Sequence, residues 1–499
     1  MSKKSRWNAS RGRSKRHRSK RKRHASHNLN IPRLRIGYFE EPVLGFGDGR
    51  PHVDIKTGLT LYGPRSLNVP SLHPDAVRVG FIGSGASIGS ARKWFESCLD
   101  GVEGDEDNEC FPGFSRTEGF RSQLLFDSRW EETLTQRELL SVAAPRLRKD
   151  RFKAAVELVS DKLRRLSGKD RPPDYVVLAL PNEMLDHCKT VDYKDDELGT
   201  VHRDFRRALK AEAMRFRLPT QILLQKVSEA EPKARGVDHK SRCAWNLFTG
   251  LYFKAGGVPW VPVSLKAGTC YIGVSFYRAL GSYRSHTTRT AVAQAFDEHG
   301  NGLVLRGPEF VWDEHEQGTA AAHLSAEQAS ELLGLVLKQY SDEMGQLPSR
   351  VVVHKSSRFW PEEREGFEEA LAGIHQFDLV SVQFSNEMRL LREGQYPALR
   401  GTHFSVGDRH FLYTTGFIPA LATYPHGHVP SPLQIADHVG DTPVEDLLRE
   451  ILVLTRMNWN SAGFAGGKPI TLRFSRLVGD IMKEIAPDKE PRPQFKFYM

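Results

Sequence analysis

The stretch from Cys270 to Phe384 opens with CYIGVSFY at residues 270–277, an apolar run rich in β-branched and aromatic residues. Two further strand candidates follow, TAVAQAF at 290–296 and LVL at 303–305, and the turn HGNG at 299–302 joins them. Strands that follow one another across so short a turn predict an antiparallel meander. The stretch therefore begins as a sheet of three neighbouring strands.

The pattern then changes to alternating helices and strands. We expect a helix at 325–344, the strand RVVVH at 350–354, a helix at 361–373 and the strand LVSVQF at 379–384. Three strands followed by helix, strand, helix and strand is the element order of an RNase H type fold. Residues 261–499 are therefore predicted to form one RNase H-like domain.

A second alternation precedes this domain. YVVLAL at 175–180 has the composition of a buried strand, residues 200–216 are predicted as a helix, and residues 222–224 as a second short strand. Strands that alternate with helices favour a parallel sheet with helices on its faces. Residues 169–260 are thus predicted to form a Rossmann-like domain, and the whole chain is expected to be α/β.

The residues before 169 have a less regular pattern. VRVGFI at 77–82 is expected to be a strand, and residues 149–165 have the apolar spacing of an amphipathic helix. Residues 31–168 are interpreted as an N-terminal segment that leads into the Rossmann-like domain.

Charge is distributed unevenly along the 499 residues. The chain carries 71 Lys and Arg against 61 Asp and Glu, a formal charge of +10, and 12 of those basic residues lie within residues 1–30, which contain no acid. This stretch has too little apolar surface to fold, so it is predicted to be a disordered basic tail. Dense positive charge favours nucleic acid through counterion release, although a tail that only improves solubility has the same composition.

The composition also indicates the compartment. No uncharged apolar run is long enough to cross a bilayer, and no apolar segment follows the basic N-terminus as in a signal peptide. The five cysteines form no C-x-x-C pair, so reduced cysteines are expected. The protein is predicted to be cytoplasmic and without membrane partners.

The predicted helix at 200–216 carries an unusual set of cations. His202, Arg206 and Lys210 are four residues apart and would share one face, with only Asp204 close by in sequence to compensate their charge. Such a face is stable if it is fully solvated, or if an anion such as phosphate binds to it.

The residues that follow this helix resemble the MID domain of Argonaute proteins. The resemblance rests on LPTQILL at 218–224 and AWNLFTGLYFKAGGVPW at 244–260. In that family these segments surround the 5′ phosphate of a guide strand, and Gln221 and Lys254 match its glutamine and lysine. A second lysine of many eukaryotic members falls on Gly250, so the resemblance implies a pocket that relies on the His202, Arg206 and Lys210 face.

The later sequence resembles the PIWI domain of the same family. VVVHKSSRF at 351–359 and the segments RMNWNSAG and PITLRFSRL within 456–477 carry this resemblance, and residues 39–64 resemble the start of short prokaryotic Argonautes. Such proteins have only MID and PIWI domains. The resemblance implies the same organisation here.

A PIWI domain that cleaves its target holds two Mg²⁺ ions with carboxylates, which are the hard oxygen ligands that these ions require. The family's first aspartate falls here on Ser275, the second on Ser356, and the last metal-binding position on Arg476. Hydroxyls and a guanidinium cannot replace that charge, so the protein is not expected to be an enzyme. A shifted register would supply Asp297 or Glu298, but neither lies on the first strand.

The resemblance implies a binding protein. It would hold a guide RNA or DNA, pair it with a complementary target, and work with a separate subunit that joins an APAZ region to a sirtuin-like, TIR or nuclease effector in defence against plasmids or phage. Lys355 and Arg358 are candidates for contact with the nucleic-acid backbone. The alternative hypothesis is a stand-alone RNase H-like guided nuclease, which Ser275 and Ser356 disfavour.

The sequence ends in PQFKFYM, with three aromatic residues before Met499. Exposed aromatic side chains would be unfavourable, so this segment is predicted to pack inward. In the family it resembles, the C-terminal carboxylate helps to hold a divalent ion at the guide 5′ phosphate, which would give Met499 a role with Mg²⁺. A packed apolar terminus without metal is the alternative.

Overall fold

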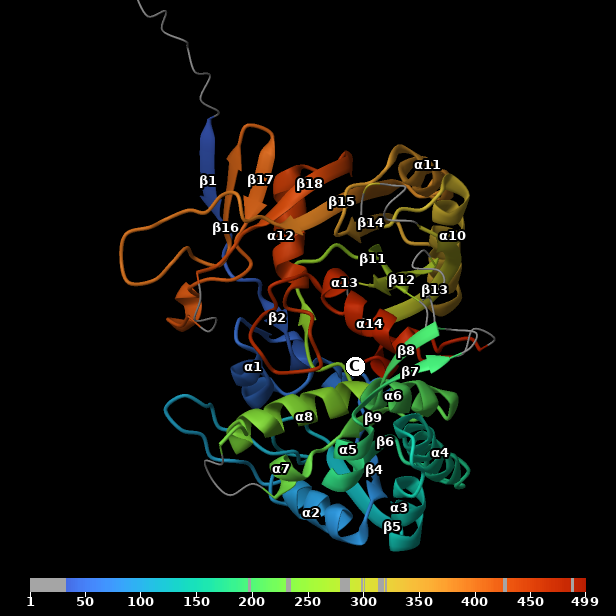
Figure 1. Cartoon of the computed structure of the whole chain (residues 1–499). Helices are drawn as coiled ribbons and strands as arrows, with labels where there is room; N and C mark the ends of the chain where they lie inside the picture. The colour runs from blue at the N-terminus through green and yellow to red at the C-terminus, as the bar shows by residue number, and fades with distance from the viewer. Residues whose placement is uncertain are drawn as a thin grey trace, which may run out of the picture.

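The computed structural model describes residues 33–195, 199–229, 235–278, 288–297, 299, 301–312, 318, 321–424, 429–485 and 489–499. Figure 1 shows two lobes, one with the strands β11 to β18 and one with the helices α2 to α8. The predicted basic tail, residues 1–30, lies outside the described residues. None of the five cysteines forms a disulfide.

The larger lobe is built on a nine-stranded sheet of order β1-β16-β17-β18-β15-β14-β11-β12-β13. Its strands are β1 (Leu34–Tyr38), β11 (Thr269–Arg278), β12 (Thr288–Phe296), β13 (Gly302–Val311), β14 (Arg350–Lys355), β15 (Gln376–Phe384), β16 (Thr402–Val406), β17 (Arg409–Leu412) and β18 (Leu433–Gly440). β11, β12 and β13 are antiparallel neighbours, and β14 and β15 add in parallel to β11. The RNase H-like element order is confirmed.

Helices cover both faces of this sheet. Successive side chains of a central strand point to opposite faces, and those on both faces are apolar. Val351 and Val353 of β14 pack toward α10 (Ala326–Met344) and α11 (Pro361–Ala370), whereas Val352 belongs to the other face. That face is covered by α12 (Val444–Leu454), α13 (Ile470–Arg473) and α14 (Ser475–Met482). The three parallel strands β11, β14 and β15 are therefore buried on both faces, as parallel strands usually are.

The smaller lobe contains a four-stranded sheet of order β5-β4-β6-β9, in which every neighbouring pair is parallel. Its strands are β4 (Ala76–Gly83), β5 (Gln123–Thr133), β6 (Tyr175–Ala179) and β9 (Thr220–Ile222). This arrangement agrees with the predicted Rossmann-like fold. The predicted boundary between residues 168 and 169 passes through the sheet, since β4 and β5 come from the segment that was expected only to lead into it.

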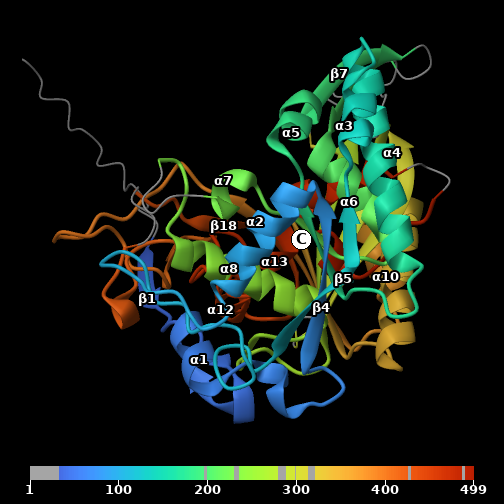
Figure 2. The ribbon, with the colours of Figure 1, turned by 90° about the horizontal axis from the view of Figure 1, so that it is seen from below.

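Four helices enclose this sheet. α2 (Gly85–Glu96) and α8 (Lys240–Lys254) share a core with one face, and α4 (Arg148–Ser167) and α6 (Phe205–Arg215) share a core with the other. Figure 2 shows α4 and α6 on one side of β4 and β5, and α2 and α8 on the other. The smaller helices of the lobe are α3 (Gln136–Ala143), α5 (Asn182–Cys188) and α7 (Gln225–Ser228).

The N-terminal segment joins the two lobes. β1 pairs with β16 at the edge of the large sheet, before the chain forms β2 (Leu44–Gly45), β3 (Pro51–His52) and α1 (Ile55–Tyr62). β2 pairs with β3 and with β10 (Val261–Pro262). The carboxylate of Glu41 accepts hydrogen bonds from the buried guanidinium groups of Arg400 and Arg456. This segment is therefore anchored in the larger lobe as well as in the smaller one.

One predicted element differs from the structure. Residues 199–204 form the strand β8 (Gly199–Asp204), which pairs with β7 (Thr190–Asp195), and α6 begins only at Phe205. Thr200 and Val201 are β-branched and favour the hairpin. The Asp204 side chain accepts a hydrogen bond from the Arg207 N–H and so caps the start of α6.

Across the described ranges, the structure contains no helix with the length and apolar character that a membrane span requires.

Candidate functional site

A cavity of about 520 Å³ lies between α6, β9, α8 and the end of the chain, close to the C mark in Figure 1. Cationic and amide side chains share its wall with a larger set of apolar side chains. Its lining residues are Trp94, Asp204, Arg206, Arg207, Lys210, Gln221, Ile222, Leu223, Leu224, Val227, Cys243, Asn246, Leu247, Gly250, Asn460, Leu477 and Met499. Of the predicted phosphate-binding residues, Arg206, Lys210 and Gln221 therefore meet in one place.

Lys210 is the cation at the centre of this group. Its ammonium donates a hydrogen bond to the main-chain oxygen of Met499. Removal of water around the ammonium lowers the pKa of Lys210 to about 8, and repulsion from Arg206 contributes to this change. An anion in the cavity would stabilise the charged form of both side chains.

Lys254 stands behind Gln221 and does not line the cavity. Its ammonium donates to the Gln221 side-chain oxygen at 3.0 Å and to the Thr220 carbonyl at 3.2 Å. Lys254 is only 1% exposed, and burial, together with repulsion from Lys210, holds its pKa well below the usual value for lysine. Lys254 therefore fixes the glutamine and adds positive potential from inside the protein.

The remaining cations of this region have partners that the sequence did not reveal. Arg203 of β8 pairs with Glu484 at 2.7 Å, and Arg207 pairs with Asp480 of α14 at 2.7 Å. Asp204, the one carboxylate among the described lining residues, caps α6. Among the residues that the structure describes, no aspartate or glutamate side chain pairs with Arg206, Lys210 or Lys254.

His202 does not belong to the predicted cationic face. It lies on β8 rather than on α6, is exposed, and its ring nitrogen contacts the Asp192 carboxylate across the hairpin. It is absent from the cavity wall described above. The expectation that His202 shares a helix face with Arg206 and Lys210 is therefore wrong, because the helix starts three residues later.

The apolar part of the cavity was not predicted. Trp94 of α2, Leu224 and Val227 next to β9, and Leu477 of α14 contribute to it. At Gly250, the position that matches a lysine of many eukaryotic Argonautes, a β-carbon would meet no atom closer than 3.8 Å, which is an ordinary van der Waals contact. The cavity can accept a group that is anionic at one end and flat or apolar at the other.

The end of the chain packs inward as predicted. Phe495 and Tyr498 are each 1% exposed, and Phe497 and Met499 are also buried. Phe495 packs edge-on against Phe296 of β12, and Tyr498 donates a hydrogen bond to the Arg492 carbonyl. This packing places the main-chain oxygen of Met499 at the cavity.

The expected nuclease positions lie side by side. The last paired residues of β11 and β14 are Val274 and Lys355, so Ser275 and Ser356 are the next residues on two adjacent parallel strands. The face they share is the one that approaches α13, since a β-carbon at Gly273 would collide with the Thr471 carbonyl. Arg476 is exposed on α14, which packs against β11.

A shallow cleft of about 330 Å³ adjoins Ser356. It lies at the carboxyl ends of β14 and β15. The described residues that line it are Ala321, Ser356, Ser357, Val382, Gln383, Phe384, Leu433, Lys468, Pro469 and Leu472. None of these carries a carboxylate, and within the described residues no group of three or more His, Cys, Asp or Glu side chains is arranged to hold a metal ion.

Of the two predicted backbone contacts, one is corrected. The Lys355 ammonium is 1% exposed and contacts both carboxylate oxygens of Glu363, at 2.5 and 2.6 Å, so it is not available to nucleic acid. His323 completes this buried cluster with a contact of 2.9 Å to Glu363. Arg358, in contrast, is exposed on the loop after β14.

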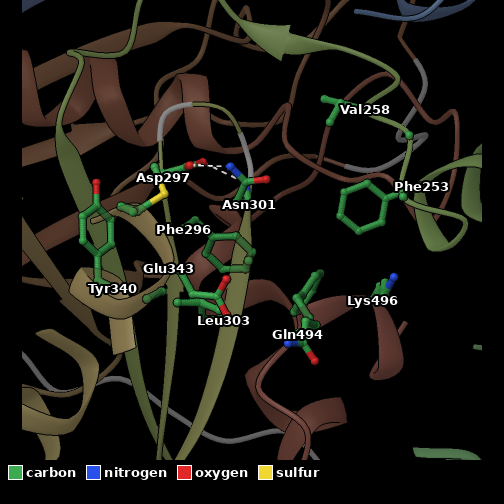
Figure 3. A pocket seen from close by; sticks show the side chains of 16 residues that line it. Phe253, Val258, Phe296, Asp297, Asn301, Leu303, Tyr340, Glu343, Gln494 and Lys496 are labelled. Atoms are coloured by element: carbon green, nitrogen blue, oxygen red, sulfur yellow. Dashed lines mark hydrogen bonds between the residues drawn. The ribbon is translucent and has the colours of Figure 1, made fainter. Parts of the chain in front are cut away.

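A further cavity, of about 370 Å³, is shown in Figure 3. Phe253 and Val258 from the end of α8, Tyr340 of α10 and Gln494 line it. Asp297, one of the two carboxylates of the shifted register, also lies here and accepts hydrogen bonds from Asn301. The other, Glu298, lies outside the described residues.

The pairing of the strands excludes that shifted register. Phe296 pairs with Tyr271 near the start of β11, so Asp297 lies at the opposite end of the strand from Ser275.

Comparison with known proteins connects this geometry to a family. No family model matches the sequence. A curated relative, protein argonaute from Thermus thermophilus, is 30% identical over 292 residues, which is 55% of this chain and 36% of the relative. The chain thus spans about a third of the length of the curated relative that it matches.

Solved structures agree in fold. Clostridium butyricum Argonaute, bound to a guide DNA and a 19-mer target DNA, superposes with a TM-score of 0.63 at 14% identity and covers 93% of this chain and 55% of its own. Drosophila Piwi gives a TM-score of 0.58 at 14% identity, and the match covers 93% of this chain and 56% of Piwi. Aquifex aeolicus Argonaute gives a TM-score of 0.57 at 15% identity, and the match covers 93% of this chain and 55% of that protein. The fold is the mixed α/β fold of these Argonaute and Piwi structures, and part of the chain is similar in sequence to protein argonaute from Thermus thermophilus.

Proposed function

We propose that this protein binds a guide strand by its 5′ phosphate in the cavity formed by α6, β9 and α8. The observation that carries the proposal is the pair Lys210 and Lys254, whose pKa values are both lowered and which no aspartate or glutamate side chain neutralises within the described chain. A phosphate would form charge-assisted hydrogen bonds with Lys210 and Arg206 and offset their repulsion. Gln221, held by Lys254, would donate its amide to the same group.

The test compares guides that carry a 5′ phosphate with guides that carry a 5′ hydroxyl. The wild-type protein should prefer the phosphate, and Lys210→Ala should remove most of that preference while leaving affinity for the hydroxyl guide nearly unchanged. Gln221→Ala should have a smaller effect, since neutral hydrogen bonds are about half as strong as charge-assisted ones. An equal loss for both guides would show that the cavity does not bind the phosphate.

The bound guide would then pair with a complementary target. Specificity would come from base pairing, while the protein holds the backbone and the shape of the duplex. This step is supported by the fold shared with Clostridium butyricum Argonaute, whose structure holds both a guide DNA and a target DNA. Whether guide and target are RNA or DNA here is decided by the same binding assay with each combination.

We infer further that the protein does not cleave its target. Ser275 and Ser356 lie where carboxylates would have to hold two Mg²⁺ ions, and hydroxyls supply no charge for them. Purified protein with guide, target and Mn²⁺ should give no product. Ser275→Asp with Ser356→Asp should not restore cleavage, since Arg476 remains and the described residues offer no group of three or more His, Cys, Asp or Glu side chains that could hold a metal ion. Cleavage by the wild type would favour the alternative, a stand-alone guided nuclease.

The active partner would be a separate subunit with an APAZ region fused to a sirtuin-like, TIR or nuclease effector, and the pair would act against plasmids or phage. Support for this part comes from residues 39–64, which resemble the start of short prokaryotic Argonautes. Co-expression with the product of the neighbouring gene tests it. The complex should show effector activity only when guide and complementary target are both present.

Mg²⁺ at the 5′ phosphate is a separate proposal. The main-chain oxygen of Met499 lines the cavity and could ligate such an ion, but Lys210 already donates to that oxygen and can supply the positive charge. Guide binding is therefore to be measured with Mg²⁺, with a chelator and with a C-terminal tag. If neither chelation nor the tag changes affinity, Met499 has no role with metal.

A further inference from the structure

We propose that the cleft next to Ser356 is a phosphate-binding site, in which Lys468 supplies the positive charge that metal ions supply in a cleaving PIWI domain. The inference rests on the proposed function, because the phosphate would belong to the strand or duplex that the guide cavity positions. It assigns a role to Lys468, which no sequence motif indicated. It also explains how the cleft can contact nucleic acid without a metal.

The position of the cleft is the first argument. Ser356 directly follows β14, and Gln383 and Phe384 end β15, so the cleft lies outside the carboxyl ends of two parallel strands. Ligands of open α/β sheets bind at this edge.

The chemistry of the lining is the second argument. Lys468 is the charged residue among the described lining residues, and the hydroxyls of Ser356 and Ser357 and the amide of Gln383 can donate hydrogen bonds. A cation would be repelled by this set, whereas a phosphate oxygen would be bound by it.

The state of Lys468 is the third argument. Lys468 is exposed, and within the described residues its ammonium has no hydrogen bond or ion pair. The ammonium lies over the Phe384 ring, at 5.6 Å from the ring centre. By comparison, Lys355 on the opposite face of β14 is fully paired with Glu363. The Phe384 ring holds the lysine at the cleft while leaving its hydrogen-bonding capacity for a ligand.

The geometry of the loop supports a fixed position for Lys468. Gly466 donates a backbone hydrogen bond to the Thr455 carbonyl, and the Gly467 carbonyl accepts one from the Thr414 hydroxyl at 2.7 Å. Pro469 then starts the buried helix α13. The residues on both sides of Lys468 are therefore anchored, so the ammonium is presented from a fixed backbone.

The experiment measures target affinity of the guide-loaded protein over a range of salt concentrations. Lys468→Ala should weaken target binding about tenfold at low salt and reduce the slope of log affinity against log salt by about 0.7 to 0.9, the value for one phosphate contact. Lys468→Arg should retain most of the slope. The matched control is Lys266→Ala, an exposed lysine near the opposite end of β11, which should change neither quantity.

A neutral methylphosphonate, introduced at one linkage of the guide or target at a time, locates the contact. At one linkage, the losses of target affinity caused by the methylphosphonate and by Lys468→Ala should not add, because both changes remove the same interaction. If Lys468→Ala behaves as Lys266→Ala does, or if its effect adds to that of every single linkage, the inference is wrong. Loading of the 5′-phosphorylated guide is measured separately, so loss of loading by the wild type would count against the proposed function instead.

Discussion

Buried cations occur in two settings in this molecule. At the start of β14, the Arg350 guanidinium contacts Asp378 at 2.8 Å and Glu450 at 2.6 Å, and Thr442 and His438 complete the network around Asp378. At the cavity between α6, β9 and α8, Lys210 lines the wall and Lys254 lies behind Gln221, and neither has an aspartate or glutamate partner among the described residues. The first arrangement is complete within the protein and stabilises it. In the second, Lys210 donates to the main-chain oxygen of Met499 and Lys254 donates to the oxygens of Thr220 and Gln221, so that an anion from outside would add the carboxylate-like partner that both lack. Four predictions test this difference.

The largest effect is expected where the network is complete. Asp378→Asn leaves the charge of Arg350 with only Glu450 to balance it in a buried site, and breaking such a pair costs about 3 to 5 kcal/mol. The free energy of unfolding, measured with urea, should fall by that amount. Glu368→Gln, which removes the exposed partner of Arg364, is the control and should cost less than about 1 kcal/mol. If Asp378→Asn and Glu368→Gln lower the free energy of unfolding by similar amounts, the buried network around Arg350 does not stabilise the protein more than an exposed ion pair does.

Lys210→Met should have the opposite effect: little change in the free energy of unfolding and a large loss of guide affinity. It removes a cation whose pKa is already lowered, so the free energy of unfolding of the guide-free protein should not fall by more than about 0.5 kcal/mol. Affinity for a 5′-phosphorylated guide should drop by about 1.5 to 3 kcal/mol, the range for hydrogen bonds to charged groups.

The matched control for this variant is Arg207→Met, which lies on the same helix and lines the same cavity but loses an ion pair with Asp480. It should change guide affinity by less than about threefold, or 0.7 kcal/mol. If both variants lose guide affinity equally, the ion pair of Arg207 with Asp480 does not keep Arg207 from binding the guide. The distinction between paired and unpaired cations would then be wrong.

The third prediction concerns pH. The pKa of Lys210 in the free protein is lowered to about 8, and a bound phosphate would raise it, so the bound state retains a proton that the free state loses above pH 8. Affinity for the phosphorylated guide should therefore be constant from about pH 7 to 8 and decrease as pH rises further, by up to tenfold per unit. The hydroxyl guide should lack this decrease, as should Lys210→Met.

The smallest effect is expected at His202. This side chain is exposed on the β7–β8 hairpin and contacts Asp192 rather than the cavity. His202→Ala should alter guide affinity by less than about 0.5 kcal/mol, as is usual for surface substitutions. A loss comparable to that of Lys210→Met would mean that the hairpin moves His202 into the site when a guide binds.

Sequence reasoning succeeded where local signals determine structure. The helix expected at 325–344 is α10, Ala326–Met344, because Ser325 and Gln328 form a capping box at its start and Gly345 adopts a left-handed conformation at its end. The strands β11 and β14 were located by their apolar residues. Gln221 and Lys254 were singled out by a resemblance in the loops and helix around them, and the structure brings the two side chains together, although only Gln221 lines the cavity.

Sequence reasoning failed where the fold brings a residue to an interaction partner that local patterns do not indicate. Arg203 and Arg207, which lie beside the predicted cationic face, pair with carboxylates in and just after α14, nearly three hundred residues later, and the local sequence could not indicate these partners. Lys355 looked available although Glu363 is only eight residues away, because the chain has to turn into α11 before the carboxylate reaches the ammonium. The start of α6 was misplaced because the spacing of charged residues along 200–216 fits a helix, while pairing with β7 makes residues 199–204 a strand.

The N-terminal strand β1 has a consequence for how the protein is made. Its partner β16 is separated from it by most of the chain, so β1 leaves the ribosome long before Phe404 and Ser405 exist to pair with it. Loop closure over such a distance is slow, and domains otherwise complete themselves in the order of synthesis. The edge of the large sheet thus closes only after the strands up to β16 have been translated, and until then the backbone N–H and C=O groups of β1 are unpaired and accessible to chaperones or other chains.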